Sequence, residues 1–311
     1  MTQARILVCG AGGFLGSHIC QHFSQRGYTV AAVGRAPKQT VPELYGALDF
    51  FSSISLPDGA IAPILTEFAP DVLIYCAGTA SVPHSFQAPY TDFQHSVDAC
   101  AFMLETLRQY APNCQLIFLS SAALYGNSQQ LPISESTAIA PVSPYGYHKQ
   151  ICEILIEEYS KLYGLRTAIL RVFSAYGERL KRQVIYDLCQ KLFDPTVVRI
   201  ELHGTGQESR DFIHAADVAA AIECVICAGV TGVYNVGSGQ QTSISKLVQL
   251  LSHLSNHQKI YQFNQRIRPG DPVNVEADIT KLQHLGFMPS VTLVEGLQKY
   301  WSWFTSEKGD S

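Results

Sequence analysis

Short apolar runs alternate with longer amphipathic segments along the first half of the chain. The apolar runs are nearly continuous and rich in Val, Ile and Leu, as strands buried on both faces are. They cover residues 4–10, 28–35, 71–78, 114–121 and 166–174. Apolar residues recur at helical spacing in 17–27, 90–111 and 145–163, which predicts helices there. This alternation predicts an α/β fold in which helices cover both faces of a parallel sheet.

The alternation becomes irregular after residue 175. Charged and aromatic segments, among them ERLKRQ, HGTGQESRDF and YQFNQRIRPGDP, interrupt short helical patterns. No repeat, low-complexity tract or flexible linker is visible, so we expect the two parts of the chain to pack together. We predict a domain built on the sheet over residues 1–174 and roughly 213–240, and a smaller, irregular C-terminal lobe over 175–212 and 241–311.

Composition and charge exclude several classes of protein. Of the 311 residues, 47% are apolar and 15% are charged, as in a globular protein. The net charge of −4 and the lack of a Lys/Arg block argue against nucleic acid or a membrane surface as a partner. The N-terminus shows no signal-peptide pattern and no apolar run is long enough to span a bilayer, so we expect a cytoplasmic protein.

The Cys and His residues do not form a metal-binding pattern. The nine cysteines are scattered without the spacing of a disulfide framework. Cys224 and Cys227 form a CxxC inside a smooth helical pattern that has no second pair, and His253 and His257 lack the Glu of an HExxH motif. We therefore expect no metal.

The first predicted strand ends in a glycine-rich turn, GAGGFLGSHI. Gly10, Gly13 and Gly16 have the spacing GxxGxxG, with Phe14 and Leu15 between the last two. Glycines between a strand and a helix let the backbone turn tightly and approach a pyrophosphate, which a helix N-terminus favours electrostatically. We predict a dinucleotide site here; the alternative is a tight turn without a ligand.

The end of the second predicted strand bears on which dinucleotide is bound. An acidic residue there would bind the ribose 2′-hydroxyl of NAD, whereas an Arg accommodates the 2′-phosphate of NADP. The sequence reads VGRAPK, with Arg35 followed by Lys38 and no carboxylate. We predict NADP(H), while NAD(H) stays open if Arg35 is an exposed side chain without a contact.

The stretch SPYGYHK places Tyr145 four residues before Lys149. On a helix these two side chains lie one above the other on a single face, and Pro144 suits a first helical turn. A phenol is a poor acid or base at neutral pH, and a neighbouring ammonium lowers the pKa of a phenol. The pair therefore indicates acid–base chemistry, although an ordinary amphipathic helix could begin in the same way.

Several motifs occur together in the order found in one enzyme family. They are GAGGFLG (10–16), SSAALYG (120–126), YGYHK (145–149), LRVFSAYG (170–177), GTGQESRDFIHAADVA (204–219), YNVGSG (234–239), RPGDP (268–272) and LGFMPSVTLVEGL (285–297). On these motifs the chain resembles the extended short-chain dehydrogenase/reductases of the NAD-dependent epimerase/dehydratase family. These act on nucleotide sugars as 4-epimerases, 4,6-dehydratases or 4-keto-sugar reductases. The resemblance implies a Rossmann-type doubly wound sheet with a C-terminal substrate-binding lobe.

The resemblance also implies a catalytic set of Ser121, Tyr145 and Lys149. Tyr145 would be the general acid/base, Lys149 would also hydrogen-bond the nicotinamide ribose, and Ser121 would hold the reacting oxygen. Ser120 is the competitor for the role of Ser121, since either hydroxyl could simply cap the loop after its strand. When SSAALYG is aligned with the family's SSAxxYG motif, the implied catalytic serine is Ser121.

Further positions are carried over from the resemblance alone. Cys76, Ala77 and Gly78 would line the cofactor ribose, and Arg171 would be structural. The residues implied to contact substrate are Ser81, Ser85, Arg210, Arg268 and Asp271, of which the two arginines would bind the diphosphate.

Two departures from the family pattern affect the proton relay and the substrate pocket. Ser96 stands in DFQHSV where most relatives have an Asn that supports the active-site helix. Ser174 follows RVF where many epimerases have an Asn.

The choice of reaction rests on a few positions. Ala122, Ala123 and Leu124 follow the catalytic Ser where dehydratases carry carboxylates, which argues against dehydration. Arg35 favours an NADP(H)-dependent 4-ketoreductase of a nucleotide-linked 4-keto-6-deoxyhexose. An NAD-dependent 4-epimerase and a non-catalytic dinucleotide-binding protein are the alternatives. By the same resemblance, the helices over 90–111 and 144–163 predict a homodimer.

Overall fold

The computed structural model describes residues 4–35, 48–255, 259–266, 270 and 272–309. Its centre is a seven-stranded sheet in which every pair of neighbouring strands is parallel. In their order across the sheet, the strands are β10 (Gly232–Val236), β6 (Thr167–Val172), β5 (Gln115–Ser121), β4 (Val72–Tyr75), β1 (Arg5–Cys9), β2 (Thr29–Gly34) and β3 (Phe50–Ser53). The predicted parallel α/β fold is confirmed.

The strand order reverses between β1 and β4. From the central β1 the chain adds β2 and β3 on one side, then returns to add β4, β5 and β6 on the other. A reversal of this kind opens a crevice at the carboxyl ends of the two strands, where open α/β sheets bind their ligands. The glycine-rich turn follows β1 at this point.

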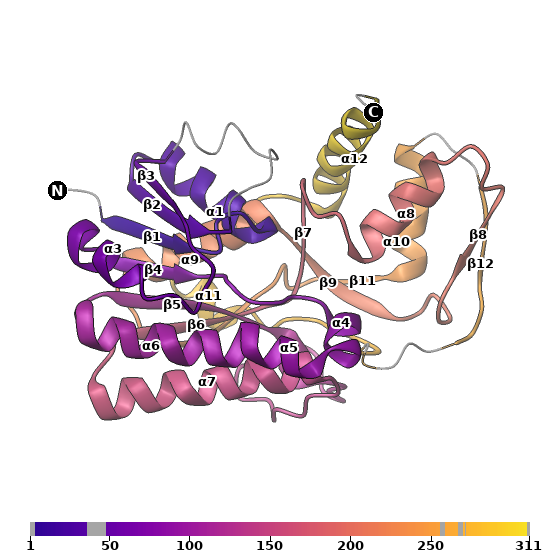
Figure 1. Ribbon diagram of the computed structural model, residues 1–311. Coiled ribbons are helices and arrows are strands. Elements are labelled where there is room, and N and C mark those ends of the chain that lie inside the picture. Colours follow the sequence, from indigo (N-terminus) through magenta and orange to yellow (C-terminus); the bar gives the residue numbers. More distant parts are fainter. Residues whose placement is uncertain (1–3, 36–47, 256–258, 267–269, 271, 310–311) are drawn as a thin grey trace.

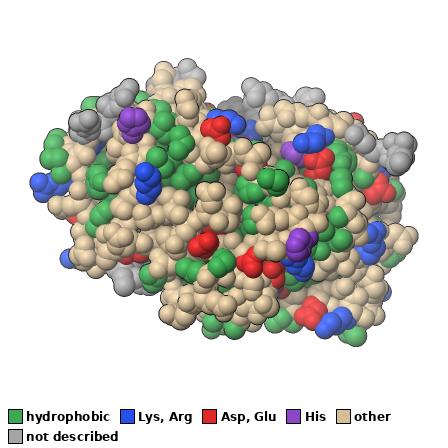
Figure 2. All heavy atoms as spheres, turned by 180° about the vertical axis from the view of Figure 1, so that it is seen from behind, with side chains coloured by type: hydrophobic (Ala, Val, Ile, Leu, Met, Phe, Trp, Pro, Cys, Tyr) green, Lys and Arg blue, Asp and Glu red, His purple; other side chains and the backbone are tan. Residues whose placement is uncertain are grey.

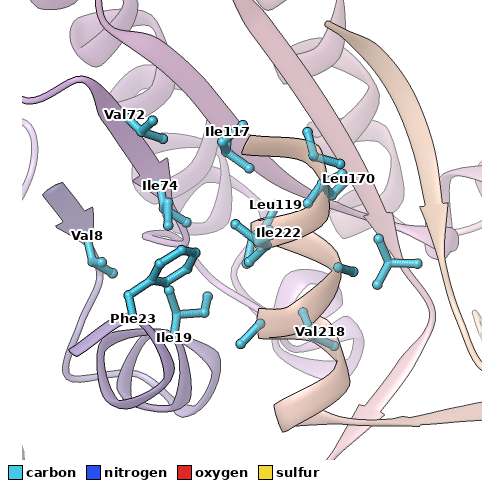
Figure 3. Close-up of a cluster of buried hydrophobic side chains, with 14 of the residues drawn as sticks. Val8, Ile19, Phe23, Val72, Ile74, Ile117, Leu119, Leu170, Val218 and Ile222 are labelled. Carbon is cyan, nitrogen blue, oxygen red and sulfur yellow. The ribbon is translucent and has the colours of Figure 1, made fainter. Parts of the chain in front are cut away.

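Helices cover both faces of the sheet (Figure 1). On one face lie α1 (Phe14–Gln25), α9 (Ala215–Ala228) and α11 (Thr280–Gln283), and on the other α3 (Ile61–Phe68), α6 (Ala99–Tyr110) and α7 (Pro144–Tyr163). Figure 3 shows Ile19 and Phe23 of α1 beside Val218 and Ile222 of α9, turned toward the strands. Burial of these side chains fixes α1 and α9 to the sheet.

The helix expected over 90–111 is present as one continuous helical segment over residues 89–110 that includes a π-helical turn. It contains α5 (Pro89–Phe93), a π-helical turn η1 (Gln94–Asp98) and α6, and the short helix α4 (Val82–Gln87) precedes it. Pro89 begins α5 because a proline is tolerated in the first helical turn. A 3₁₀ turn, η2 (Ala122–Tyr125), follows β5.

The remaining elements form the C-terminal lobe, on the right in Figure 1. Two small sheets are built from β7 (Ser174–Tyr176), β9 (Ser209–His214) and β11 (Gln241–Ser243), and from β8 (Arg199–Leu202) and β12 (Ile260–Phe263). The helices are α8 (Gln183–Phe193), α10 (Ile244–Leu254) and α12 (Leu293–Gly309). They share a core that includes Tyr176, Tyr300 and Phe304.

The surface shows no concentration of one charge on the face seen in Figure 2, where acidic and basic side chains are interspersed. Across the described parts of the chain, no helix combines the length and apolar character needed to cross a bilayer. The same residues contain no group of three His, Cys, Asp or Glu side chains placed to hold a metal ion.

Candidate active site

The glycine-rich turn packs directly against the segment after β4. Gly10 has φ +91°, and a Cβ there would lie 2.7 Å from the backbone nitrogen of Ala77. A Cβ on Gly16 would lie 2.2 Å from the carbonyl oxygen of Gly10. Both positions therefore require glycine for close backbone approach. The structure thus brings together two segments that the sequence assigned to the cofactor.

Helix α1 begins with an open N-terminus. Gly13 is its N-cap, so no side chain caps the helix, and the first turn, which contains Phe14 and Leu15, has no acidic residue. The helix dipole and free N–H groups at such an end favour a phosphate. The glycine cradle and this helix end fit the pyrophosphate of a nicotinamide dinucleotide.

Arg35 lies immediately after β2 and is exposed. Its carbonyl oxygen is 3.3 Å from where a Cβ on Gly12 would lie, so its backbone passes beside the glycine-rich turn. Gly34 precedes it, and no carboxylate occupies the position of a ribose-binding acid. Lys38 lies outside the described residues.

The segment after β4 is fixed to β1 through Cys76. Its backbone N–H and its thiol both donate to the carbonyl of Cys9, at 2.9 and 3.0 Å. Burial raises the pKa of the Cys76 thiol to about 12, which keeps it protonated and unreactive. Gly78, with φ +118°, then turns the chain toward Thr79.

Helix α7 begins where the sequence predicted. Ser143 is the N-cap and its hydroxyl accepts a hydrogen bond from the N–H of Gly146 at 3.2 Å, while Pro144 occupies the first turn. A Cβ on Gly146 would lie 2.8 Å from the carbonyl oxygen of Ala123, so this first turn packs closely against η2. The start of α7 is thereby held beside the turn that follows Ser121.

Tyr145 and Lys149 lie on one face of α7, as their spacing predicts. The Tyr145 side chain is almost buried, and the Nζ of Lys149 lies 5.9 Å from the centre of its ring. The same Nζ donates to the carbonyl of Leu119 on β5 at 2.9 Å and lies 4.8 Å from the centre of the Phe118 ring. The ammonium is therefore held against the strand that carries Ser121.

The two adjacent serines at the end of β5 have different surroundings. Ser120 is buried and its hydroxyl donates to Glu153 of α7 at 2.5 Å. Ser121 is half-buried, and its hydroxyl accepts from the N–H of Ala123 at 3.2 Å. Successive side chains of a strand point to opposite faces. The hydroxyl of Ser121 keeps its own donor available, whereas Ser120 is committed to Glu153.

The residues implied to contact substrate lie in different parts of the structure, and two of them are not described. Ser81 caps α4, and the buried Ser85 accepts from the N–H of Tyr145 at 3.1 Å and donates to Val82 at 2.7 Å. Arg210 lies on β9 and donates to the carbonyl of Ser209 at 2.8 Å. Arg268 and Asp271 lie outside the described residues.

Sequence reasoning missed Glu153, which follows Tyr145 and Lys149 at the next helical repeat. Glu153 and Arg171 form a buried ion pair, with 2.7 Å between Arg171 Nη2 and Glu153 Oε2. Arg171 also donates to the Tyr125 hydroxyl at 2.9 Å. This pair joins α7 to β6, which agrees with the structural role expected of Arg171. The sequence signal that could have found Glu153 is its spacing of eight residues from Tyr145, which places both on one face of α7.

A second group was also missed. The buried Asp92 of α5 accepts a hydrogen bond from Thr79 and lies 2.5 Å from the Nδ1 of His148, while Thr79 and Ser96 lie 3.2 Å apart. His148 is adjacent to Lys149 on α7. Asp92 and Ser96 are four residues apart on one helical segment, but no spacing in the sequence joins them to Thr79 and His148, which come from other segments.

Arg182 directly precedes α8, and its side chain is exposed. Desolvation lowers the pKa of its guanidinium, and the Tyr145 phenol opposes this shift. Sequence reasoning did not single out this arginine.

Comparison with known proteins agrees with this arrangement. A family model described as the NAD dependent epimerase/dehydratase family matches residues 6–237. The UDP-glucose 4-epimerase of Bacillus subtilis is 26% identical, over 97% of this chain and 97% of that protein. The solved UDP-glucose 4-epimerase of Thermotoga maritima with UDP-glucose has a TM-score of 0.87 and 28% identity, covering 98% of this chain and 99% of its own. That of Thermus thermophilus with NAD has a TM-score of 0.87 and 27% identity, covering 97% and 99%.

These relatives favour the hypothesis of an NAD-dependent 4-epimerase over that of an NADP(H)-dependent 4-ketoreductase. They also give no support to the preference for NADP that Arg35 suggested, since the solved Thermus thermophilus enzyme holds NAD. The family model spans the glycine-rich turn, the segment that contains Ser121, Tyr145 and Lys149, and residues of all seven strands of the main sheet. The chain therefore belongs to the NAD dependent epimerase/dehydratase family, within the extended short-chain dehydrogenase/reductases.

Proposed function

We propose that the protein is a 4-epimerase of a UDP-linked hexose and that it holds NAD throughout its cycle. The observation that carries this proposal is the full-length similarity to UDP-glucose 4-epimerases. The positions of Ser121, Tyr145 and Lys149 also support it, since they lie around the start of α7 near the glycine-rich turn and the segment after β4.

In this proposal Tyr145 moves the proton. As a phenolate, Tyr145 takes the proton from the C4 hydroxyl of the sugar and becomes a neutral phenol, and it later returns this proton to the same oxygen. The Lys149 ammonium, held 2.9 Å from the Leu119 carbonyl, stabilises the phenolate before the proton is taken, and Ser121 donates to the reacting oxygen. A dinucleotide held by the glycine-rich turn would supply the hydride acceptor and donor for C4, and return of the hydride to the opposite face of C4 would invert the centre.

The local structure argues against elimination of water. The residues after Ser121 form the apolar 3₁₀ turn η2, which contains Ala122, Ala123 and Leu124. A dehydratase needs an acid and a base to remove a proton and a hydroxyl group from neighbouring carbons. This turn offers neither.

The nucleotide end of the substrate is proposed to lie over the lobe. Arg210, Arg268 and Asp271 are proposed to contact the diphosphate and the nucleotide ribose, and Ser81 and Ser85 to lie near the sugar. A guanidinium suits the diphosphate because it is always charged and can donate two hydrogen bonds at once.

We also propose a homodimer through α6 and α7, which lie side by side in Figure 1. On α7, Tyr147 is 54% exposed, Ile154 56% and Leu162 71%. These positions recur at roughly helical spacing and form an apolar stripe on the outer side of the helix. Ile154→Glu with Leu162→Glu should give a monomer by light scattering, with the cofactor still bound. A parent protein that is itself monomeric at micromolar concentration would refute the dimer.

The test of the proposed function has two parts. The nucleotide that copurifies with the protein is identified first, and NAD that survives dialysis is expected. The protein is then incubated with UDP-glucose, UDP-N-acetylglucosamine or UDP-glucuronic acid without added cofactor, and the C4 epimers are separated by chromatography. Conversion to an equilibrium mixture supports the proposal.

Tyr145→Phe connects any conversion to this site. The variant should lose turnover by about 10²–10⁴-fold while retaining its dinucleotide, because only the proton-transferring hydroxyl is removed. Tyr163→Phe, at the exposed end of the same helix, is the matched control and should retain turnover. Unchanged turnover in Tyr145→Phe would contradict the mechanism.

Arg35 supports a second candidate, an NADPH-dependent 4-ketoreductase. The exposed Arg35 at the end of β2, in the carboxylate-free sequence VGRAPK, is of the residue type that accommodates a 2′-phosphate. A reductase would consume NADPH in proportion to an added nucleotide-linked 4-keto-6-deoxyhexose. Dissociable NADPH, preferred over NADH, together with no epimer formation would favour this candidate.

A further inference from the structure

We propose that Thr79, Asp92, Ser96 and His148, here called the Asp92 cluster, set the distance between the cofactor-lining loop and the catalytic first turn of α7. This inference rests on the proposed function and concerns residues that act through their neighbours. The cluster lies beside the triad without including any of its members.

The carboxylate of Asp92 is the centre of the cluster. The Asp92 side chain is fully buried, and each of its oxygens has its own partner. Thr79 donates to Oδ1, and the Nδ1 of His148 lies 2.5 Å from Oδ2. A carboxylate removed from water is costly unless its oxygens accept hydrogen bonds or meet a positive charge. The two partners are therefore energetically required, which holds them in place.

The partners come from segments that carry the site. Thr79 directly follows Gly78 in the loop proposed to line the cofactor ribose, and its hydroxyl lies 3.2 Å from that of Ser96 in the π-helical turn. His148 lies between Tyr145 and Lys149 in the first turns of α7. Asp92 thus connects the cofactor loop to the catalytic helix through side chains alone.

The orientation of the His148 ring is also restricted. Its ring packs edge-on against Phe93, with 5.6 Å between the ring centres, and its side chain is 12% exposed. Close by, the N–H of Tyr145 donates to Ser85. The first turn of α7 is thus attached to the α4–α5 segment at two points. Loss of the His148 contact leaves the Ser85 contact, so the helix should stay folded while its position relaxes.

The Asp92 cluster thus acts on the positions of Tyr145 and the cofactor loop, and takes no part in the proton transfer itself. A displacement of about 1 Å between reacting groups can lower a rate by about 10²-fold. Loosening the cluster should therefore weaken dinucleotide binding, through Thr79 and its loop, and slow turnover, through Tyr145. It should have little effect on the KM for the nucleotide sugar, which the lobe is proposed to bind.

The test compares His148→Leu with His148→Asn. Leu removes the donor to Asp92, whereas the side-chain amide nitrogen of Asn can occupy the place of Nδ1 and restore it. We expect His148→Leu to raise the Kd for NAD and to lower kcat, each by about tenfold, for the loss of a buried charge-assisted hydrogen bond. His148→Asn should recover most of both. His95→Leu, exposed on η1, is the matched control and should behave as the parent.

Asp92→Asn adds an independent measurement. If Asp92 and His148 act as one unit, the double variant Asp92→Asn/His148→Leu should be no worse than the more damaged single variant. All values of kcat are expressed per bound dinucleotide, so that a change in the amount of folded protein does not enter the comparison.

Several results would overturn the inference. They are a His148→Leu variant with parental Kd and kcat, a His148→Asn variant as impaired as His148→Leu, and additive effects in the double variant. Failure of the proposed function gives a different result. A parent protein that binds NAD but converts no nucleotide sugar removes the epimerase proposal, while the NAD affinities of the His148 variants still decide the inference. A parent that binds no dinucleotide removes both.

Discussion

The Nζ of Lys149 donates a 2.9 Å hydrogen bond to the backbone carbonyl of Leu119, two residues before Ser121. Lys149 belongs to α7 and Leu119 to β5, so one hydrogen bond sets the height of the catalytic helix along the strand. With Tyr145 one helical turn before Lys149, it places the proposed acid/base, its ammonium and the hydroxyl proposed to be catalytic, that of Ser121, near one another.

Lys149→Met should separate stability from activity. Lys149 is 7% exposed, and among the described residues its ammonium has no carboxylate partner, so removing it from water costs free energy that no ion pair offsets. We expect the melting temperature of Lys149→Met to equal or exceed that of the parent, while kcat falls by at least ~100-fold. Calorimetry and epimer formation measure the two effects. A clearly lower melting temperature would show that the ammonium stabilises the fold.

The serine pair predicts two opposite phenotypes. Ser120→Ala leaves a buried Glu153 oxygen with one fewer donor, so we expect the free energy of unfolding to fall by about 1–3 kcal/mol with kcat per folded molecule retained. Ser121→Ala should instead lower kcat with little change in stability, because among the described residues its hydroxyl makes only the 3.2 Å contact to Ala123. Urea unfolding and initial rates test both. The reverse pattern would assign catalysis to Ser120.

The glycine-rich turn should not tolerate a methyl group at Gly16. A Cβ there would lie 2.2 Å from the Gly10 carbonyl oxygen, a distance that only a backbone shift can relieve. Gly16→Ala should therefore abolish dinucleotide binding and lower the melting temperature. Gly59→Ala is the control, since a Cβ at Gly59 meets no atom within 4 Å. Binding is followed by isothermal calorimetry, and parental affinity in Gly16→Ala would contradict the close approach.

His18 should make the fold sensitive to mild acid. Burial lowers the pKa of its imidazole to about 4, and its Nε2 lies 2.9 Å from the Glu178 carbonyl oxygen. The unfolded chain binds this proton near pH ~6.5 and the folded chain only near pH 4, so the contribution is complete above ~6.5 and declines as the pH falls toward 4. The loss reaches at most ~3 kcal/mol.

The measurement is urea unfolding at several pH values between 4 and 7, within the range set by that shift. His18→Gln cannot titrate and should flatten the decline. An unfolding free energy with the same pH dependence in parent and variant would mean that His18 is protonated equally in the folded and unfolded states.

Several parts of the site could be predicted because they depend on local rules. GxxGxxG after an apolar strand predicts a close backbone approach, and the Cβ distances at Gly10 and Gly16 show that approach. The spacing of Tyr145 and Lys149 places them on one helical face, and the structure shows them there. The division into domains and the assignment of Arg268 and Asp271 stay predictions.

Other parts could not be read from any local pattern. The helix expected over 90–111 contains a π-helical turn, η1, and its Asp92 and Ser96 contact Thr79 from another segment, neither of which any local pattern indicates. Nothing near Thr79 in the sequence predicts Asp92. A hydrogen bond across tertiary distance leaves no periodicity for sequence reasoning to detect.

By itself the sequence determined the parallel α/β architecture and the family, and it predicted the set Ser121, Tyr145 and Lys149. Those features follow from hydrophobic periodicity, turn chemistry and fixed helical spacing, which act over a few residues. The tertiary structure alone decided that Lys149 is held by the Leu119 carbonyl, that Ser120 is committed to Glu153, and that His148 meets the buried Asp92. The physical reason is that packing of separate elements determines which buried polar groups find partners, and each buried group without one would cost free energy.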